Sequence, residues 1–206
     1  MKIKVKLLLF ILIAVFVSVS SISLFFIYNV TDILKDTSLN RFKNDCGVLR
    51  DTIDGITRDV YTDLETWSQI GNIRSSLEMQ YGWEEINIML KKLISLRKGY
   101  IGSFLLDPNG VCMAGSSANF VQANISNQPW FEKVKTTKYL ISNVINFKEL
   151  SSVTNKKENY CMIFIKKLEL ADGTTLGYLL NILDWNYIQE RLNALQATYK
   201  TEGLES

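Results

Sequence analysis

The feature that most constrains this chain is a long uncharged segment near its N-terminus. After Lys6 no charged side chain occurs until Asp32, so residues 7–31 are 25 uncharged residues. A bilayer hydrocarbon core of about 30 Å needs roughly 20 helical residues, so a helix over this segment can span it. We expect a retained membrane helix. A cleavable signal peptide, whose apolar region is about 7–15 residues, is the alternative, and the serines around Ser20 would suit a cleavage site.

Charge on the two sides of the span predicts its orientation. Lys2, Lys4 and Lys6 precede it, whereas residues 32–36 carry two acidic side chains and one basic one. The positive-inside rule therefore places residues 1–6 in the cytoplasm and the rest of the chain outside, in the periplasm or the extracellular space. The later apolar runs are too short to span. We expect a single-pass protein of the cell (inner) membrane.

The remaining charge and the residue types disfavour several functional classes. The chain has 23 basic and 21 acidic residues; without the three N-terminal lysines these become 20 and 21, a net charge of −1. No basic field is left to hold a nucleic acid. Histidine is absent, which removes histidine bases, ligands and phosphotransfer. No pairing of nucleophile with base and no metal spacing occurs either. We therefore expect no enzyme, no catalytic residue, no metal and no cofactor.

The chain has three cysteines, so at least one thiol stays unpaired if a disulfide forms within the chain. Cys46 falls in a helical stretch, and Cys112 and Cys161 fall in strand-like stretches. One disulfide and three unpaired, half-buried thiols both remain open.

A regular apolar stripe follows the membrane segment. Residues 32–79 have a helical pattern, in which apolar side chains alternate at spacings of three and four: Leu39, Phe42, Cys46, Leu49, Ile53, Ile56 and Val60. This spacing is that of a coiled-coil seam over about four heptads. Packing of the helix on its own domain and dimerisation along the seam both remain open, and one long helix can serve both.

The rest of the chain reads as helices and strands of an α+β domain. Gly71 or Gly82 should interrupt the first helix, and Gly99 should cap the second. Asp107–Gly110 is a turn signal, and Asp184 suits a helix N-cap. The expected helices are 83–98, 129–135 and 185–199, and the expected strands are 100–106, 111–115, 139–147, 160–170 and 174–183. These strands predict a five-stranded antiparallel sheet with flanking helices.

Three blocks of sequence resemble the Cache family. The hairpin over 100–116 is similar to the family's first hairpin. The run 125–134, with Trp130 and Phe131, is similar to its Trp-Phe/Tyr segment, which a strand starting at Tyr139 follows. The run 176–185 resembles the last strand and the start of the exit helix. Cache domains are PAS-like extracytoplasmic sensor modules of bacterial receptors, such as chemotaxis proteins and sensor kinases. The resemblance covers roughly residues 1–199.

The resemblance implies an organisation and a function. The expected parts are a cytoplasmic tail (1–6), a transmembrane helix (7–31), an extracytoplasmic helical segment (32–98), a PAS-like sensor module (99–184) and an exit helix (185–206). The chain then looks like the membrane anchor and membrane-distal module of a larger double-Cache receptor. Its function would be to sense a small molecule on the sheet and to transmit binding through the long helix, as a homodimer in the membrane. The alternative is a membrane-anchored envelope interaction protein that dimerises through that helix.

The resemblance also implies site residues. The family's amino-acid-binding members have an Arg where this chain has Gln128 and an Asp on the last strand near Asn181, so a standard amino-acid site is disfavoured. We expect a ligand site formed by Trp130, Phe131, Gln128, Tyr139 and Asn181. For each of these residues core packing or solvent exposure is the alternative. A pocket beside Trp130 would favour the sensor, whereas a filled sheet face would favour the interaction protein.

Overall fold

The computed structural model describes residues 3–201, which fall into two compact units, Met1–Asp51 and Thr52–Ser206. Helix α1 (Ile3–Ser68) supplies all of the described first unit and continues into the second. Its portion Val15–Ser68 contains a window long and apolar enough to cross a membrane, and none of that window is buried. Phe16 and Phe25 are 71% and 72% exposed. A helix with an exposed apolar surface is able to cross a bilayer, and the expected bounds of the span, residues 7–31, stay a prediction.

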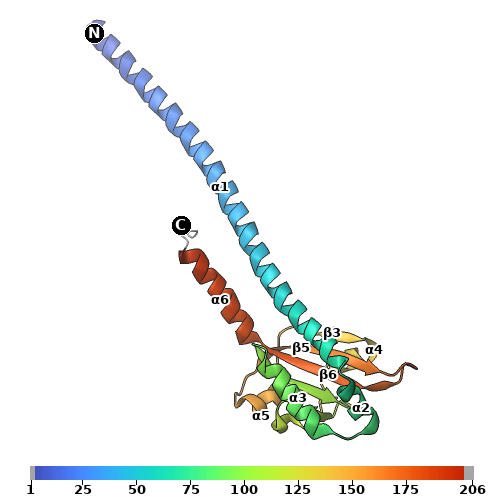
Figure 1. Ribbon diagram of the computed structural model, residues 1–206. Helices are drawn as coiled ribbons and strands as arrows, with labels where there is room; N and C mark the ends of the chain where they lie inside the picture. The colour runs from blue at the N-terminus through green and yellow to red at the C-terminus, as the bar shows by residue number, and fades with distance from the viewer. Residues whose placement is uncertain (1–2, 202–206) are drawn as a thin grey trace. The chain divides into compact units, whose positions relative to one another are not determined.

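The second unit is built on one antiparallel sheet (Figure 1). The strand order is β2-β1-β6-β5-β3, and β4 also pairs with β5. The strands are β1 (Tyr100–Leu106), β2 (Cys112–Gly115), β3 (Tyr139–Ile141), β4 (Ile145–Asn146), β5 (Tyr160–Glu169) and β6 (Thr175–Asp184). The expected α+β class and antiparallel sheet with flanking helices are confirmed; five strands form the path named above, and β4 is a sixth strand that pairs with β5 off this path.

Both faces of the sheet are buried. In the central strand β6 every residue from Leu176 to Leu183 is buried. Alternate side chains enter two separate apolar clusters: Leu180 and Ile182 belong to one, and Leu179 and Leu183 belong to the other. A strand that is apolar on both sides must be covered on both sides. We call the two sides the helix-covered face (Leu179, Leu183) and the loop-covered face (Leu180, Ile182).

Four helices cover the helix-covered face. They are the end of α1, α2 (Gly71–Met79), α3 (Trp83–Ser95) and the start of α6 (Trp185–Thr201). Val60, Leu64 and Trp67 of α1 are at most 4% exposed and pack in this cluster, with Ile53 and Ile56 half-buried at its edge. The membrane-distal part of the predicted stripe therefore packs within its own domain.

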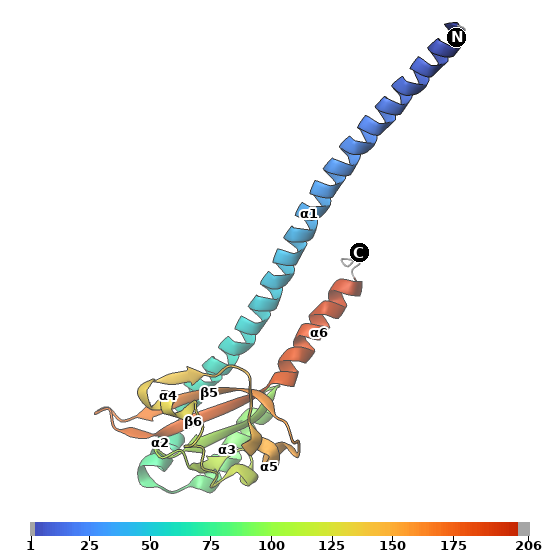
Figure 2. The same ribbon diagram turned by 180° about the vertical axis from the view of Figure 1, so that it is seen from behind.

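The opposite side is covered by loops and short helices (Figure 2). These are η1 (Ala118–Phe120), α4 (Phe131–Thr136), η2 (Lys148–Leu150) and α5 (Ser151–Thr154). They help to form an aromatic cluster, in which Phe120 contacts Phe104 of β1 at a centroid distance of 4.4 Å and meets Phe147 edge to face at 6.1 Å. All three rings are at most 1% exposed, so this face is closely filled.

Local signals predicted several boundaries correctly. The turn after β1 is closed by Asp107, whose Oδ1 accepts from the backbone N–H of Asn109 and Val111 at 2.9 and 2.8 Å. Asp184 caps α6, since its Oδ1 accepts from the N–H of Asn186 at 2.9 Å. Gly99 has φ 87°, a conformation that favours glycine, but it does not cap the second helix as expected, because α3 ends at Ser95 with Leu96 as its C-cap rather than at residue 98.

The expectation of a single strand over 139–147 is wrong. Two short strands, β3 and β4, pair separately with β5. Between them the Ser142 hydroxyl accepts the backbone N–H of Ile163 at 2.9 Å, while Ser142 donates its own N–H to the Ile163 carbonyl at 2.8 Å. The serine side chain thus replaces a backbone acceptor, and the ladder is interrupted at that point.

The three cysteines are free thiols, Cys46 exposed and Cys112 and Cys161 buried. Burial raises the pKa of both the Cys112 and the Cys161 thiol to about 12. The structure therefore favours three unpaired thiols over one disulfide, and Cys46 is the thiol that a reagent can reach.

Candidate functional site

Two of the expected site residues lie together on the loop-covered face. Trp130 and Phe131 meet edge to face at 6.2 Å, and Trp130 also contacts Phe147 at 5.9 Å. Phe131 is fully buried and Trp130 is 8% exposed. The Trp130 indole Nε1–H has no hydrogen-bond partner among residues 3–201. A buried donor without an acceptor costs about 1–3 kcal/mol, so this ring is held in the core without the polar contact that it is able to make.

Gln128 lies at the surface above this cluster. Its Nε2 donates to Glu149 Oε1 at 2.6 Å and so joins the segment before α4 to η2. A second clasp joins η1 to α5, where Asn119 Nδ2 donates to the Ser152 carbonyl at 2.8 Å. Both clasps are exposed to solvent, where a hydrogen bond contributes little net free energy. The loops and short helices of this face are thus held over the aromatic cluster mainly by packing.

Asn181 and Tyr139 lie on the other side of the sheet. Asn181 shares the side of Leu179 and Leu183, and its Oδ1 accepts from Ser103 Oγ at 2.7 Å. Tyr139 packs edge to face on Tyr61 of α1 at 5.2 Å. The structure therefore does not bring the five expected residues into one pocket. Trp130, Phe131 and Gln128 lie together, and the sheet separates them from Asn181.

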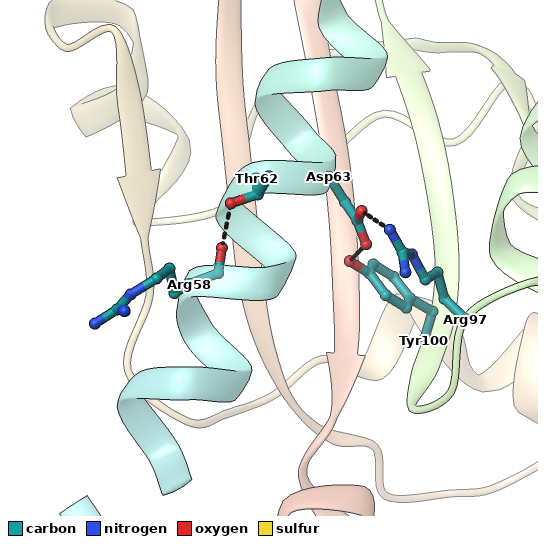
Figure 3. A network of polar contacts seen from close by, with 5 residues as sticks. All are labelled: Arg58, Thr62, Asp63, Arg97 and Tyr100. Atoms are coloured by element: carbon teal, nitrogen blue, oxygen red, sulfur yellow. Dashed lines mark hydrogen bonds and ion pairs between the residues drawn. The ribbon is translucent and has the colours of Figure 1, made fainter. Parts of the chain in front are cut away.

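A polar network that we did not anticipate lies where α1 packs on the sheet (Figure 3). Asp63 is 5% exposed. Its Oδ1 accepts from Arg97 at 2.6 Å, and its Oδ2 accepts from the Tyr100 hydroxyl at 2.9 Å. Burial and the Asp63 charge raise the pKa of Tyr100, and the hydrogen bond to Asp63 raises that of Arg97. The Asp63 side chain thus has one cationic donor, Arg97, and one neutral donor, Tyr100.

The sequence carried a signal for this network. Asp63 lies three residues after Val60 and four before Trp67, so it interrupts the apolar stripe with a charge. A carboxylate on the buried side of a helix requires donors from the facing element. Such a position predicts a partner, although it does not say which one.

Contacts on the other flank of α1 also attach it to the sheet. Glu65 Oε2 and Lys166 Nζ of β5 form an ion pair at 2.5 Å. Together with the Tyr61–Tyr139 pair, this places an ionic and an aromatic contact beside β3 and β5, while Asp63 contacts the start of β1. Side-chain contacts on two flanks thus hold the residues after 60 on the sheet.

No metal site appears in the described part of the chain. Residues 3–201 contain no group of three or more His, Cys, Asp or Glu side chains that could hold a metal ion. The site candidates are therefore the Trp130 cluster and the Asp63 network.

Solved structures with this fold are sensor domains. The chain is similar to the sensor domain of the histidine kinase DctB from V. cholerae, with a TM-score of 0.63, 14% identity, and 75% of this chain and 59% of that chain covered. It is also similar to the sensor domain of DcuS from E. coli, with a TM-score of 0.55, 12% identity, and 69% and 98% covered. A domain of a sensory box/GGDEF family protein from Vibrio parahaemolyticus matches with a TM-score of 0.58, 12% identity, and 77% and 63% covered.

These likenesses establish the fold and confirm the expected sensor-domain architecture. The chain spans about three fifths of the length of the DctB structure. No family model and no curated protein matches the sequence. The structural neighbours thus show the fold of this chain.

The Glu65–Lys166 pair predicts an acid-sensitive contribution to stability. The hydrogen bond from Lys166 is the largest cause that holds the pKa of Glu65 below its ordinary value of 4.5. A depressed folded-state pKa stabilises the fold above the ordinary pKa, and this contribution is lost as the pH falls through the lowered value. We expect Lys166→Met to lower the urea midpoint at pH 6 and to have progressively less effect below about pH 4.5.

The measurement is urea unfolding of the purified chain in detergent between pH 6 and pH 3. Lys167→Met is the matched control, since Lys167 pairs with Glu169 at 2.8 Å and leaves Glu65 untouched. An equal effect of Lys166→Met at pH 6 and pH 3 would contradict the assignment of the pair.

Proposed function

We propose that this chain is the extracytoplasmic sensing module of a transmembrane signal-transduction receptor. The observation that carries the proposal is the sheet domain, which has the fold of a histidine kinase sensor domain at a TM-score of 0.63. An N-terminal helix with a window apolar enough to cross a membrane accompanies it. The proposal assigns no catalytic residue, metal or cofactor.

We place the ligand on the loop-covered face, beside Trp130, Phe131 and Gln128. The supporting observations are the unpartnered Trp130 Nε1–H inside an aromatic wall and the two solvent-exposed clasps that close over it. This face is filled, which is the outcome that we expected of an interaction protein, so a ligand site here requires the segments at Gln128 and Glu149 to separate. The ligand therefore selects an open state and binds with an affinity reduced by the low population of that state.

The wall defines the chemistry of the ligand. Aromatic rings favour a flat or apolar body, and the Trp130 N–H needs one acceptor. Gln128 offers both an amide donor and an acceptor at the rim, with no positive charge for a carboxylate. A small neutral or mixed-polarity molecule fits this set. Asn181 and Tyr139 contact α1 or its side of the sheet and are assigned to packing.

Transmission would run through α1. The sheet holds this helix through the Asp63 network and the Glu65–Lys166 pair. A ligand that favours one arrangement of the sheet shifts the equilibrium of the contacts on its other face, with a typical coupling of about 1–3 kcal/mol.

Trp130→Phe tests the ligand site. The change keeps an aromatic ring and removes the unpartnered N–H together with part of the indole, so we expect folding to persist with some loss of packing and the affinity for a ligand that uses this donor to fall about tenfold. A thermal-shift screen of the purified chain against small metabolites supplies the ligand, and calorimetric titration measures the affinity. Gln128→Ala should weaken discrimination between related ligands more than it weakens folding.

Trp185→Phe is the control for this test. Trp185 packs half-buried on the helix-covered face, so its replacement should leave the affinity unchanged. Equal affinities of the wild type, Trp130→Phe and Gln128→Ala would contradict the site.

Cys46 offers a direct test of topology. It is the exposed thiol of the three, and we place it outside the cell membrane. A membrane-impermeant maleimide should label intact cells that express the chain and should fail to label Cys46→Ser. Val5→Cys in the Cys46→Ser background should react only after the cells are permeabilised. The reverse pattern would invert the proposed orientation.

A second candidate function, self-association through α1, is favoured by a specific observation. The stripe continues into the first unit, where Leu39, Phe42 and Leu49 are 52%, 66% and 38% exposed. Apolar side chains at a/d spacing, left exposed on a helix, are typical of a coiled-coil seam. Dimerisation is compatible with sensing. If the chain binds no ligand, dimerisation would be its function as an envelope interaction protein.

Cys46 lies on this stripe between Phe42 and Leu49 and so reports dimerisation. In a parallel pair of helices two seam cysteines face each other. A mild oxidant such as copper phenanthroline should therefore give a disulfide-linked dimer in membranes, which a reductant reverses. Leu49→Asp should abolish the crosslink, whereas Asp51→Asn, outside the stripe, should not. A chain that stays monomeric in this assay would contradict self-association along the stripe.

A further inference from the structure

A small pocket with charged walls lies on the helix-covered face, away from the ligand site proposed above. Its volume is about 240 Å³, and its floor includes Val60 and Leu183, both at most 2% exposed. Ligand pockets for drug-sized molecules are about 300–1,000 Å³, so this one suits a molecule the size of an amino acid.

Charges of opposite sign form two facing walls. Asp59 and Asp63 come from α1, and Arg97 and Lys98 come from the turn between α3 and β1. Asp63 and Arg97 neutralise each other at 2.6 Å. Asp59 and Lys98 are exposed, and among the described side chains neither makes a hydrogen bond or an ion pair, although Asp59 is near enough to Arg97 and Tyr100 to raise the pKa of both. One negative and one positive side chain of the pocket are therefore accessible to a ligand.

Arg97 adds donors to the positive wall. Its guanidinium has five N–H donors, and the bond to Asp63 uses one nitrogen. The side chain is 55% exposed, so its remaining N–H groups are accessible. The Tyr100 hydroxyl and Arg97 hold the Asp63 carboxylate from both oxygens, which keeps the guanidinium in place for a second acceptor.

We propose that this pocket binds a small zwitterion, whose carboxylate meets Arg97 and Lys98, whose ammonium group meets Asp59, and whose aliphatic body rests on Val60 and Leu183. A purely anionic ligand would bring an unmatched charge beside Asp59, and a purely cationic one would bring it beside Lys98. A zwitterion matches both walls and leaves the pocket neutral.

Such a ligand would bridge several elements. The pocket also contains Tyr187 of α6, which packs tightly against the turn at Gly99: a Cβ on Gly99 would lie 2.3 Å from the Tyr187 ring. A bound zwitterion therefore contacts α1, the turn before β1 and the surroundings of α6 at the same time. It stabilises the docked arrangement of these elements because it binds only when both walls are present.

The test uses L-leucine and two analogues that each lack one charge, 4-methylpentanoate and 3-methylbutylamine. In calorimetric titrations of the whole chain in detergent, L-leucine should bind saturably, and each analogue should bind about tenfold or more weakly. Asp59→Asn and Lys98→Gln should each weaken L-leucine binding by about the same factor. Arg58→Gln is the matched control, because the Arg58 side chain points away from Asp63 in Figure 3.

Three outcomes would overturn the proposal. They are the absence of saturable L-leucine binding up to about 10 mM, tenfold above a millimolar Kd, equal binding of L-leucine and either analogue, and unchanged affinity in both Asp59→Asn and Lys98→Gln. Trp130→Phe separates this pocket from the loop-covered face. L-leucine binding should survive that change, and its loss there would assign the molecule to the other site.

Discussion

The burial of β6 on both faces is the constraint on which the rest of the domain depends. Eight successive residues, Leu176–Leu183, are buried in the strand at the centre of the sheet order. A strand of this kind provides no face to solvent, so the chain must build two coverings. Four helices form one, and loops with an aromatic cluster form the other. The two coverings differ in chemistry, and each of the candidate sites lies beneath one of them.

Each face also holds one buried polar group without a partner in the described part of the chain. These are the Trp130 indole N–H on the loop-covered face and the Asn181 amide N–H on the helix-covered face. Unpaired buried donors are uncommon because each one costs free energy. Ser103 satisfies the Asn181 oxygen, which makes that side chain half of a structural pair. Trp130 has no such pair, and this difference supports Trp130 rather than Asn181 as the ligand contact.

Local signals in the sequence were enough to predict much of the fold. They were insufficient where contacts between residues far apart in the sequence determine the structure. β1, the turn closed by Asp107 and the cap at Asp184 depend on a few neighbouring residues, and they were predicted. The face on which Asn181 lies was not predictable, because β6 is apolar on both sides and a shift of one residue reverses every side chain. The interruption at Ser142 depends on a hydrogen bond with Ile163 of β5, 21 residues later. The partners of Asp63 come from a turn more than thirty residues away.

The charge of Asp63 within an otherwise apolar stripe limits how α1 is able to move. Successive residues of a helix are rotated by about 100°, so a turn by one position carries the carboxylate away from Arg97 and Tyr100, either into the apolar surroundings of Leu64 or to the exposed position of Thr62. Intermediate rotations leave both a buried anion and a buried phenol unpaired, and they are high in free energy. Asp63 therefore favours one rotational setting of α1, in which its carboxylate contacts both Arg97 and Tyr100. The helix rests in this setting on the sheet, and any departure from it is a discrete step instead of a gradual twist.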